Sequence, residues 1–329
     1  MTSERPRPLP LPIAIALWAA IGLAAAVYGS YHGYGGPRYA VMVVVTVWML
    51  GAQVIPASGG LIERISSRVS PSVATVFCTI PILTYVVYAV GTNSLWWPNV
   101  VLVAGMSIVP TAFAASAGKA PFGAWQDYAA MASLAIPFWL GWTQYMWPYP
   151  TIKINYAMSV LLVIQIAEIV FLLVRRAPDV GYSFAWSWKW VPVVLVCFAG
   201  VAIVDIPLAL KIHFLRFDPS NGHHKLIPLE LIGTFIFTAW TEEFFFRGIL
   251  QNALSRTLRS DAAGLTVASI LFGIAHINHA YFPNWKYVIV ATVAGLFYGL
   301  AWKNTRSMAG SGVIHAAVDV TMHQLFRVI

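Results

Sequence analysis

The stretch IGTFIFTAWTEEFFFRGIL, residues 232–250, places two glutamates and an arginine in a run that is otherwise apolar. Ionisable side chains at membrane depth are costly in free energy, so they are rare unless a partner or a function retains them. Glu243 and Arg247 are four residues apart, with the acid first, which is the favoured spacing for an ion pair on a helix. Glu242 points about 100° round the helix from Glu243 and needs partners from other segments.

The composition of the whole chain is that of a membrane protein. Of its 329 residues, 59% are hydrophobic and only 10% are charged, whereas soluble domains carry roughly 25% charged residues. The net charge of +8 is typical of basic loops held on the cytoplasmic side of a membrane. We therefore expect membrane lipid around the chain and no nucleic-acid partner. Cys78 and Cys197 lie in apolar runs and are predicted to be packing residues.

The hydropathy pattern predicts an all-α fold, a polytopic transmembrane helical bundle of about eleven spans. These spans lie near residues 11–29, 39–58, 72–91, 98–117, 127–147, 154–174, 190–212, 228–254, 262–282, 287–302 and 308–326. The N-terminal stretch resembles a signal peptide, but its apolar run is long enough to span, and we expect it to be retained as the first helix. The loop lysines and arginines predict a multi-pass protein of the cell (inner) membrane with a cytoplasmic N-terminus.

A domain boundary is predicted at the polar, turn-prone segment RRAPDVGYSFAWSWKW, residues 175–190. Residues 1–178 would form an N-terminal transmembrane region of about six spans, to which the sequence assigns no role. Residues 179–329 carry most of the ionisable groups that fall within spans, so any chemistry is expected there. His223 and His224 are expected to be exposed loop histidines rather than metal ligands.

Two further spans of the C-terminal half contain ionisable groups. One reads ASILFGIAHINHAYF, residues 268–282, with His276 and His279 one turn apart; the last span carries His315 and Asp319 at i and i+4. Counted at about 1.5 Å per residue from the arginines expected at the inner edge of the membrane (Arg256, Arg259 and Arg306), Glu242, His276 and His315 lie roughly 20, 25 and 14 Å into the membrane. Three helices can therefore bring a carboxylate and two imidazoles to a similar level.

Such a group of side chains favours hydrolysis. A carboxylate and neutral imidazoles can take a proton from water, and the remaining donors can stabilise an oxyanion. Alternatively, Glu242, His276 and His315 could bind a divalent metal such as zinc, which activates its own water. Both routes lead to hydrolysis of a carbonyl compound, most simply a peptide bond. The chain contains neither HExxH nor GxSxG, and the cofactor stays open between a divalent metal and none.

Three motifs in this order resemble the CPBP intramembrane proteases, also called the CAAX-protease or Abi family, which includes the type II prenyl-protein endopeptidases. The family pattern is EExxxR, then FxxxH, then HxxxN or HxxxD, each on its own transmembrane helix. The matching residues here are Glu242, Glu243 and Arg247, then Phe272 and His276, then His315 and Asp319. The resemblance covers about residues 190–329 and implies a CPBP-like helical core.

The resemblance implies an intramembrane protease, either glutamate-type or metal-dependent, that cuts a membrane-anchored or lipidated protein. It implies that Glu242 activates water with help from His276, and that His315 and residue 319 stabilise the oxyanion. Glu243 and Arg247 would brace the helix. In the prenyl endopeptidases position 319 is Asn, which can donate to an oxyanion. An ionised Asp319 cannot, and is expected to orient or charge His315 or to help hold a metal.

Two other classes of protein use similar groups. A proton-coupled transporter or a lipid-binding membrane module would use the carboxylate and the histidines as a proton relay. It would show gradient-dependent uptake or binding and no proteolysis. A scaffold would use the polar groups only to pack helices against one another, so that a substitution of His276 would lower stability without affecting a reaction.

Overall fold

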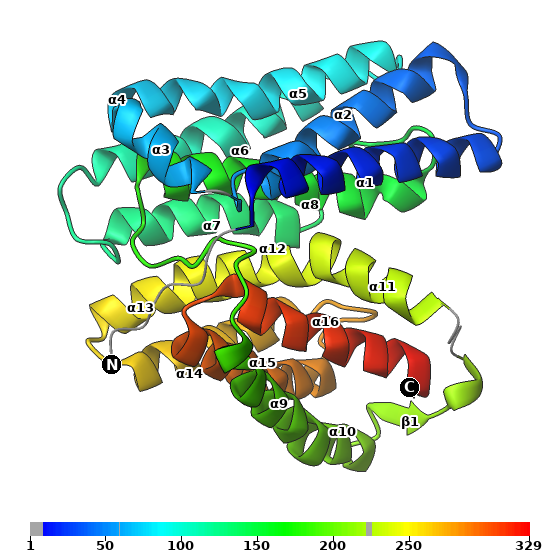
Figure 1. Cartoon of the computed structure of the whole chain (residues 1–329), viewed down its shortest axis with the longest axis vertical. Coiled ribbons are helices and arrows are strands. Elements are labelled where there is room, and N and C mark those ends of the chain that lie inside the picture. The colour runs from blue at the N-terminus through cyan, green and yellow to red at the C-terminus, as the bar shows by residue number, and fades with distance from the viewer. Residues whose placement is uncertain (1–8, 59, 222–225) are drawn as a thin grey trace. The chain divides into compact units, whose positions relative to one another are not determined.

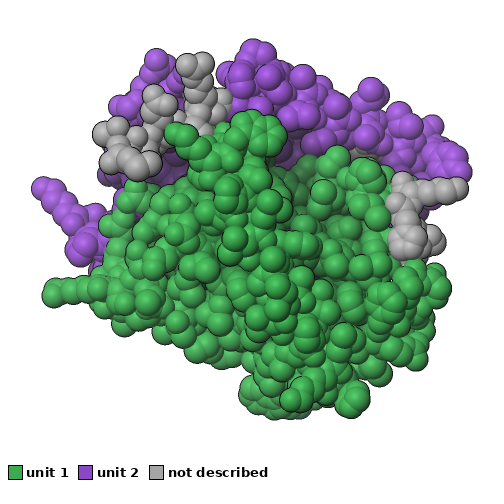
Figure 2. All heavy atoms as spheres, turned by 60° about the horizontal axis from the view of Figure 1, so that its bottom comes forward, with its two compact units in different colours: residues 1–7, 179–329 green, residues 8–178 purple. Residues whose placement is uncertain are grey.

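The computed structural model describes residues 9–58, 60–221 and 226–329, and nearly all of their regular structure is helical (Figure 1). The predicted all-α fold is confirmed. The chain divides into two compact units, one ending at Pro178 and the other running from Asp179 to Ile329, which Figure 2 distinguishes by colour. Each unit is described by itself.

The N-terminal unit is built entirely from helical segments. They are α1 (Leu11–Tyr31), α2 (Gly36–Val54), α3 (Leu61–Arg68), α4 (Pro71–Ala74), η1 (Thr75–Cys78), α5 (Thr79–Gly91), α6 (Trp97–Ser116), α7 (Trp125–Trp139), η2 (Ile152–Ile154), α8 (Asn155–Ala167) and η3 (Glu168–Val174). A buried ion pair ties this unit together, with Nε of Arg175 2.5 Å from Oδ1 of Asp127. The second carboxylate oxygen of Asp127 accepts the backbone N–H groups of Gly123 and Ala124, at the start of α7.

The C-terminal unit is a helical bundle with one short strand pair. Its segments are η4 (Trp188–Trp190), α9 (Val191–Gly200), η5 (Val201–Asp205), α10 (Ile206–Lys211), β1 (Leu215–Phe217), η6 (Pro219–Asn221), α11 (Ile227–Thr234), η8 (Phe235–Ala239), α12 (Trp240–Glu243), η9 (Phe244–Gln251), α13 (Asn252–Thr257), α14 (Asp261–Ala275), α15 (Trp285–Thr305), α16 (Met308–Leu325) and β2 (Phe326–Val328). Strands β1 and β2 pair antiparallel, with Arg216 opposite Arg327. The apolar core forms where α9, α14, α15 and α16 meet, and contains Cys197, Phe272 and Tyr298.

Residues 227–257 form one unbroken helix whose hydrogen bonding changes near its middle. The segments η8 and η9 have π-helical hydrogen bonding and flank α12, which carries Glu242 and Glu243. Short π-helical stretches inside α-helices occur frequently at functional sites. Helix α16 packs along this long helix, so residues of its successive turns face α11, η8 and α12.

Capping side chains and one glycine set how α14, α15 and α16 begin and pack. Ser260, Asn284 and Ser307 each accept a backbone N–H of the first turn of the helix that follows, as N-cap residues do. Helices α14 and α15 approach closely at Gly273, where an added Cβ would lie 2.0 Å from Oγ1 of Thr292. The approach therefore requires glycine at this position.

Among the described residues, seven helices are long and apolar enough to cross a membrane. They are Leu11–Tyr31, Gly36–Val54, Pro71–Gly91, Trp97–Ser116, Asn155–Val174, Trp188–Lys211 and Trp285–Thr305, and each coincides with a predicted span. The other predicted spans are also largely helical. Two of them correspond to α7 and α14, of 15 residues each, and the remaining two carry the charged and polar residues of the candidate site. The chain is a multi-pass membrane protein.

Candidate active site

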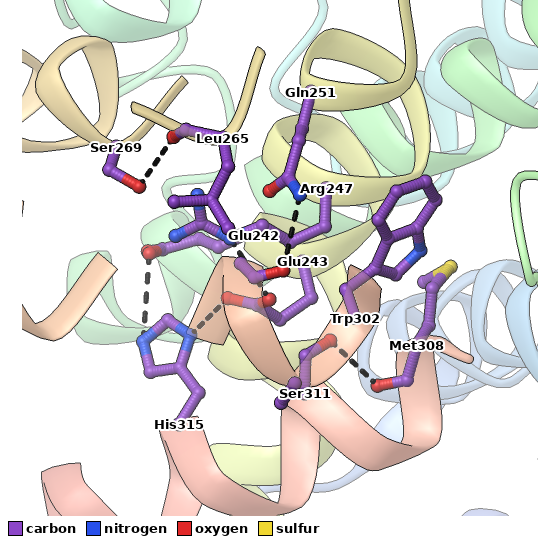
Figure 3. Close-up of polar contacts among 12 residues, drawn as sticks. Glu242, Glu243, Arg247, Gln251, Leu265, Ser269, Trp302, Met308, Ser311 and His315 are labelled. Atoms are coloured by element: carbon purple, nitrogen blue, oxygen red, sulfur yellow. Dashed lines mark hydrogen bonds and ion pairs between the residues drawn. The ribbon is translucent and has the colours of Figure 1, made fainter. Parts of the chain in front are cut away.

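The imidazole of His315 lies between the carboxylates of the two adjacent glutamates of α12 (Figure 3). Its Nδ1 is 2.9 Å from Oε1 of Glu243. Its Nε2 lies 3.8 Å from Oε2 of Glu242 and 3.6 Å from Oδ2 of Asp319, which is one turn further along α16. The ring is almost completely buried, with 3% of the residue exposed. One imidazole therefore faces three carboxylates.

Glu243 connects this imidazole to the arginine of the first motif. Its other carboxylate oxygen, Oε2, lies 3.2 Å from Nε of Arg247, which is the ion pair that the i, i+4 spacing predicts, and both side chains are fully buried. The guanidinium also lies over the ring of Phe272, 5.0 Å from its centroid. Because Glu243 can only accept, we assign a proton to Nδ1 of His315, so that Nε2 faces Glu242 and Asp319.

His276 ends α14, and its ring is fixed by a bond to its own helix. Its Nδ1 donates to the carbonyl oxygen of Phe272 at 2.8 Å, which leaves Nε2 as the nitrogen able to accept a proton. The ring of Phe272 contacts both histidines, with centroids 4.8 Å from that of His276 and 5.8 Å from that of His315. The FxxxH motif thus places one aromatic ring against both imidazoles.

Glu242 and Asp319 are the partly exposed members of the group. Their side chains are 23% and 28% exposed, against 4% for His315. The Oε2 atom of Glu242 is itself buried and has no hydrogen-bond partner among the residues that the structure describes. A carboxylate in this position is free to accept a proton from a water molecule.

Sequence reasoning missed the aromatic residues that line the imidazoles. The ring of Tyr298, on α15, stacks on His315 with centroids 4.5 Å apart and planes 17° from parallel. The ring of Tyr287, also on α15, packs against His276. Neither tyrosine belongs to the EExxxR, FxxxH or HxxxD motif, and the sequence around them, with Lys286 directly before Tyr287, does not indicate that their rings contact a histidine.

The other histidines of the C-terminal half lie outside this group or outside the described residues. Nδ1 of His323 pairs with Oε1 of Glu230 at 3.0 Å, near the start of α11. The ring of His279 packs against Tyr287, with centroids 5.1 Å apart. His223 and His224 lie outside the described residues.

The described side chains of the site do not fit a metal centre. Across the described parts of the chain, no three or more His, Cys, Asp or Glu side chains are arranged as a group that could hold a metal ion. In particular, Glu242, His276 and His315, the predicted alternative ligand set, do not form such a group, and Nδ1 of His315 is occupied by Glu243.

A largely buried group of carboxylates and imidazoles on packed helices defines a polar site in this membrane protein, and one family model matches the segment that contains it. Residues 224–321 match the family model described as Rce1-like, type II CAAX prenyl endopeptidase Rce1-like. All three motifs lie within this segment, which carries the CPBP/CAAX protease family domain, so the resemblance is confirmed. A comparison with curated proteins and one with solved structures each found no match.

Proposed function

We propose that this protein is an intramembrane endopeptidase that hydrolyses a peptide bond of a membrane-associated, lipidated protein or peptide. The family match supports CAAX-type endopeptidase activity in general. The observation that carries the finer proposal is the position of His315, whose Nε2 faces Glu242 and Asp319 while Glu243 holds Nδ1. No contact of the described residues favours the proton-coupled transporter or the lipid-binding module over this reading.

In this proposal Glu242 activates the water. Its Oε2 has no hydrogen-bond partner among the described residues, so it can accept the proton of a water molecule as that water attacks the scissile carbonyl. His276 assists through Nε2, the nitrogen that its bond to Phe272 leaves available. The proton then passes from Glu242 to the leaving amine, and the carboxylate is regenerated.

His315 stabilises the charge that develops on the carbonyl oxygen. A protonated Nε2 is a donor, and the three carboxylates around the ring favour its cationic form. A charged donor held in a dry site stabilises an oxyanion more strongly than the same donor in water. Asp319 supports this step by charging His315 and not by donating, because a carboxylate only accepts.

The lysine and arginine distribution supports a cell (inner) membrane location with the N-terminus in the cytoplasm. The N-terminal unit has no assigned chemistry, and we propose that it guides the substrate helix or binds a partner.

The proposed function is tested by comparing the membrane peptidomes of cells that carry the wild type or Glu242→Gln. We expect at least one lipidated protein to lose a C-terminal fragment with the wild type only. Identical peptidomes, together with uptake that depends on a proton gradient, would contradict the protease and support a transporter.

Replacing Asp319 with Asn is expected to lower kcat by about 10²-fold, a typical cost of weakening one oxyanion-stabilising interaction. The reason is that Asn would no longer favour the cationic form of His315, while its similar shape preserves the packing. The measurement is steady-state cleavage of a farnesylated peptide by the purified protein, with and without a metal chelator.

The matched control is Asp261→Asn, which makes the same change in a surface pair with Arg306 and should leave kcat unchanged. Retained or raised activity in Asp319→Asn would show that residue 319 donates to the oxyanion, contrary to the proposal. Loss of wild-type activity in the chelator would point to a metal-dependent reaction.

A further inference from the structure

The side chains around His315 offer few hydrogen-bond donors to an oxyanion. Glu242, Glu243 and Asp319 all face this ring, and carboxylates only accept hydrogen bonds when ionised. Of the four side chains in this group, only His315 can donate to a negatively charged oxygen. A second donor that is neutral would stabilise the oxyanion without adding another charge to this buried group.

Tyr287, in the first turn of α15, is placed to be that donor. Its ring packs against His276 with centroids 4.8 Å apart. The ring also packs against the apolar cluster that contains Phe272 and Val318, the residue before Asp319. Tyr287 therefore lies on the His276 side of the site, whereas the other aromatic residue of α15, Tyr298, covers the flat face of the His315 ring.

The position of Tyr287 is fixed by the loop that follows His276. Asn284 is 1% exposed and caps α15, its Oδ1 accepting the backbone N–H of Tyr287 at 3.0 Å. Its Nδ2 donates to the carbonyl of His279 at 3.0 Å, and its backbone N–H donates to the carbonyl of Ile277 at 2.7 Å. The end of α14 and the start of α15 thus form one hydrogen-bonded unit, which sets Tyr287 against His276.

We propose that the hydroxyl of Tyr287 donates a hydrogen bond to the carbonyl oxygen of the scissile peptide bond as charge develops there, and is a second oxyanion donor beside His315. The inference rests on the proposed hydrolytic function. The O–H bond of Tyr287 stays intact throughout the step, so the phenol transfers no proton and stays neutral. The water proton still passes through Glu242 to the leaving amine.

The test uses the full-length protein in lipid vesicles and a farnesylated peptide that ends in cysteine, two aliphatic residues and a variable residue. Tyr287→Phe keeps the ring against His276 and removes one oxygen. We expect kcat to fall by about 10²-fold with KM within a factor of two, because the lost bond forms only in the transition state. The control is Tyr281→Phe, the same change at a residue 49% exposed in the same loop, which should match the wild type.

A second measurement separates catalysis from structure. A farnesylated peptide aldehyde, whose hydrate resembles the tetrahedral intermediate, should bind Tyr287→Phe more weakly by about the factor lost in kcat. Wild-type kcat in Tyr287→Phe would overturn the inference, and so would a fall in kcat with unchanged affinity for the aldehyde. A wild type that does not cleave the peptide, and that binds the aldehyde no more tightly than the peptide, would contradict the proposed protease function itself. That outcome is distinct from failure of the role assigned to Tyr287.

Discussion

Glu242→Gln is expected to reduce peptide cleavage by about 10³-fold, within the range of general-base catalysis, while the protein still folds. Gln has the shape of Glu but cannot take a proton from water. The side chain is partly exposed and its Oε2 has no hydrogen-bond partner among the described residues, so its charge is not needed for packing. The measurement is single-turnover cleavage of the farnesylated peptide by purified protein, with thermal unfolding recorded in parallel.

The matched control is Glu230→Gln on the same long helix, where the glutamate pairs with His323 and not with the catalytic group. This control should cleave at close to the wild-type rate. A Glu242→Gln variant that retains more than a tenth of the activity would require another general base, and His276 would be the first candidate.

Glu243→Ala is expected to destabilise the protein by about 3–5 kcal/mol, the cost of removing one partner of a buried ion pair. Arg247 is 0% exposed and would keep its charge without its carboxylate partner. His315 would lose the acceptor of its Nδ1–H, so the ring would no longer be oriented. Both the yield of folded protein and the activity should fall. Thermal unfolding in detergent measures the loss of stability.

The double variant Glu243→Ala/Arg247→Met separates the two roles of Glu243. Replacing the buried arginine with an apolar side chain removes the uncompensated charge, so much of the stability should return. Activity should stay low because His315 still lacks its acceptor. A single Glu243→Ala variant that is as stable and as active as the wild type would contradict both roles.

Local spacing predicted the parts of the site that lie within one or two turns of a helix. The Glu243–Arg247 pair follows from i, i+4 spacing, and the bond from His276 to the carbonyl of Phe272 spans the same distance. By contrast, the bond between His315 and Glu243 joins residues 72 positions apart. No local pattern specifies which of two adjacent glutamates meets a distant histidine, and this contact depends on how α12 packs on α16.

The helical class could be predicted because long apolar runs indicate helices buried in lipid. The lengths of the helices and the buried polar contacts could not be predicted in this way. Helix α14 ends at Ala275, so His276 lies at the end of a helix and not within a span that continues to residue 282. Asp127 was not recognised as important, since its partner Arg175 is 48 residues away and neither lies in a motif. The π-helical segments beside α12 leave the apolar pattern unchanged and have no sequence signature.

The most direct test of a hydrolytic site is to incubate the purified wild type with the farnesylated peptide in water enriched in the heavy isotope of oxygen. The masses of the products are then measured by mass spectrometry. The account predicts release of the residues after the lipidated cysteine, with one heavy oxygen in the new carboxyl group of that cysteine. A peptide that remains intact with folded protein in lipid vesicles would contradict the account for this class of substrate.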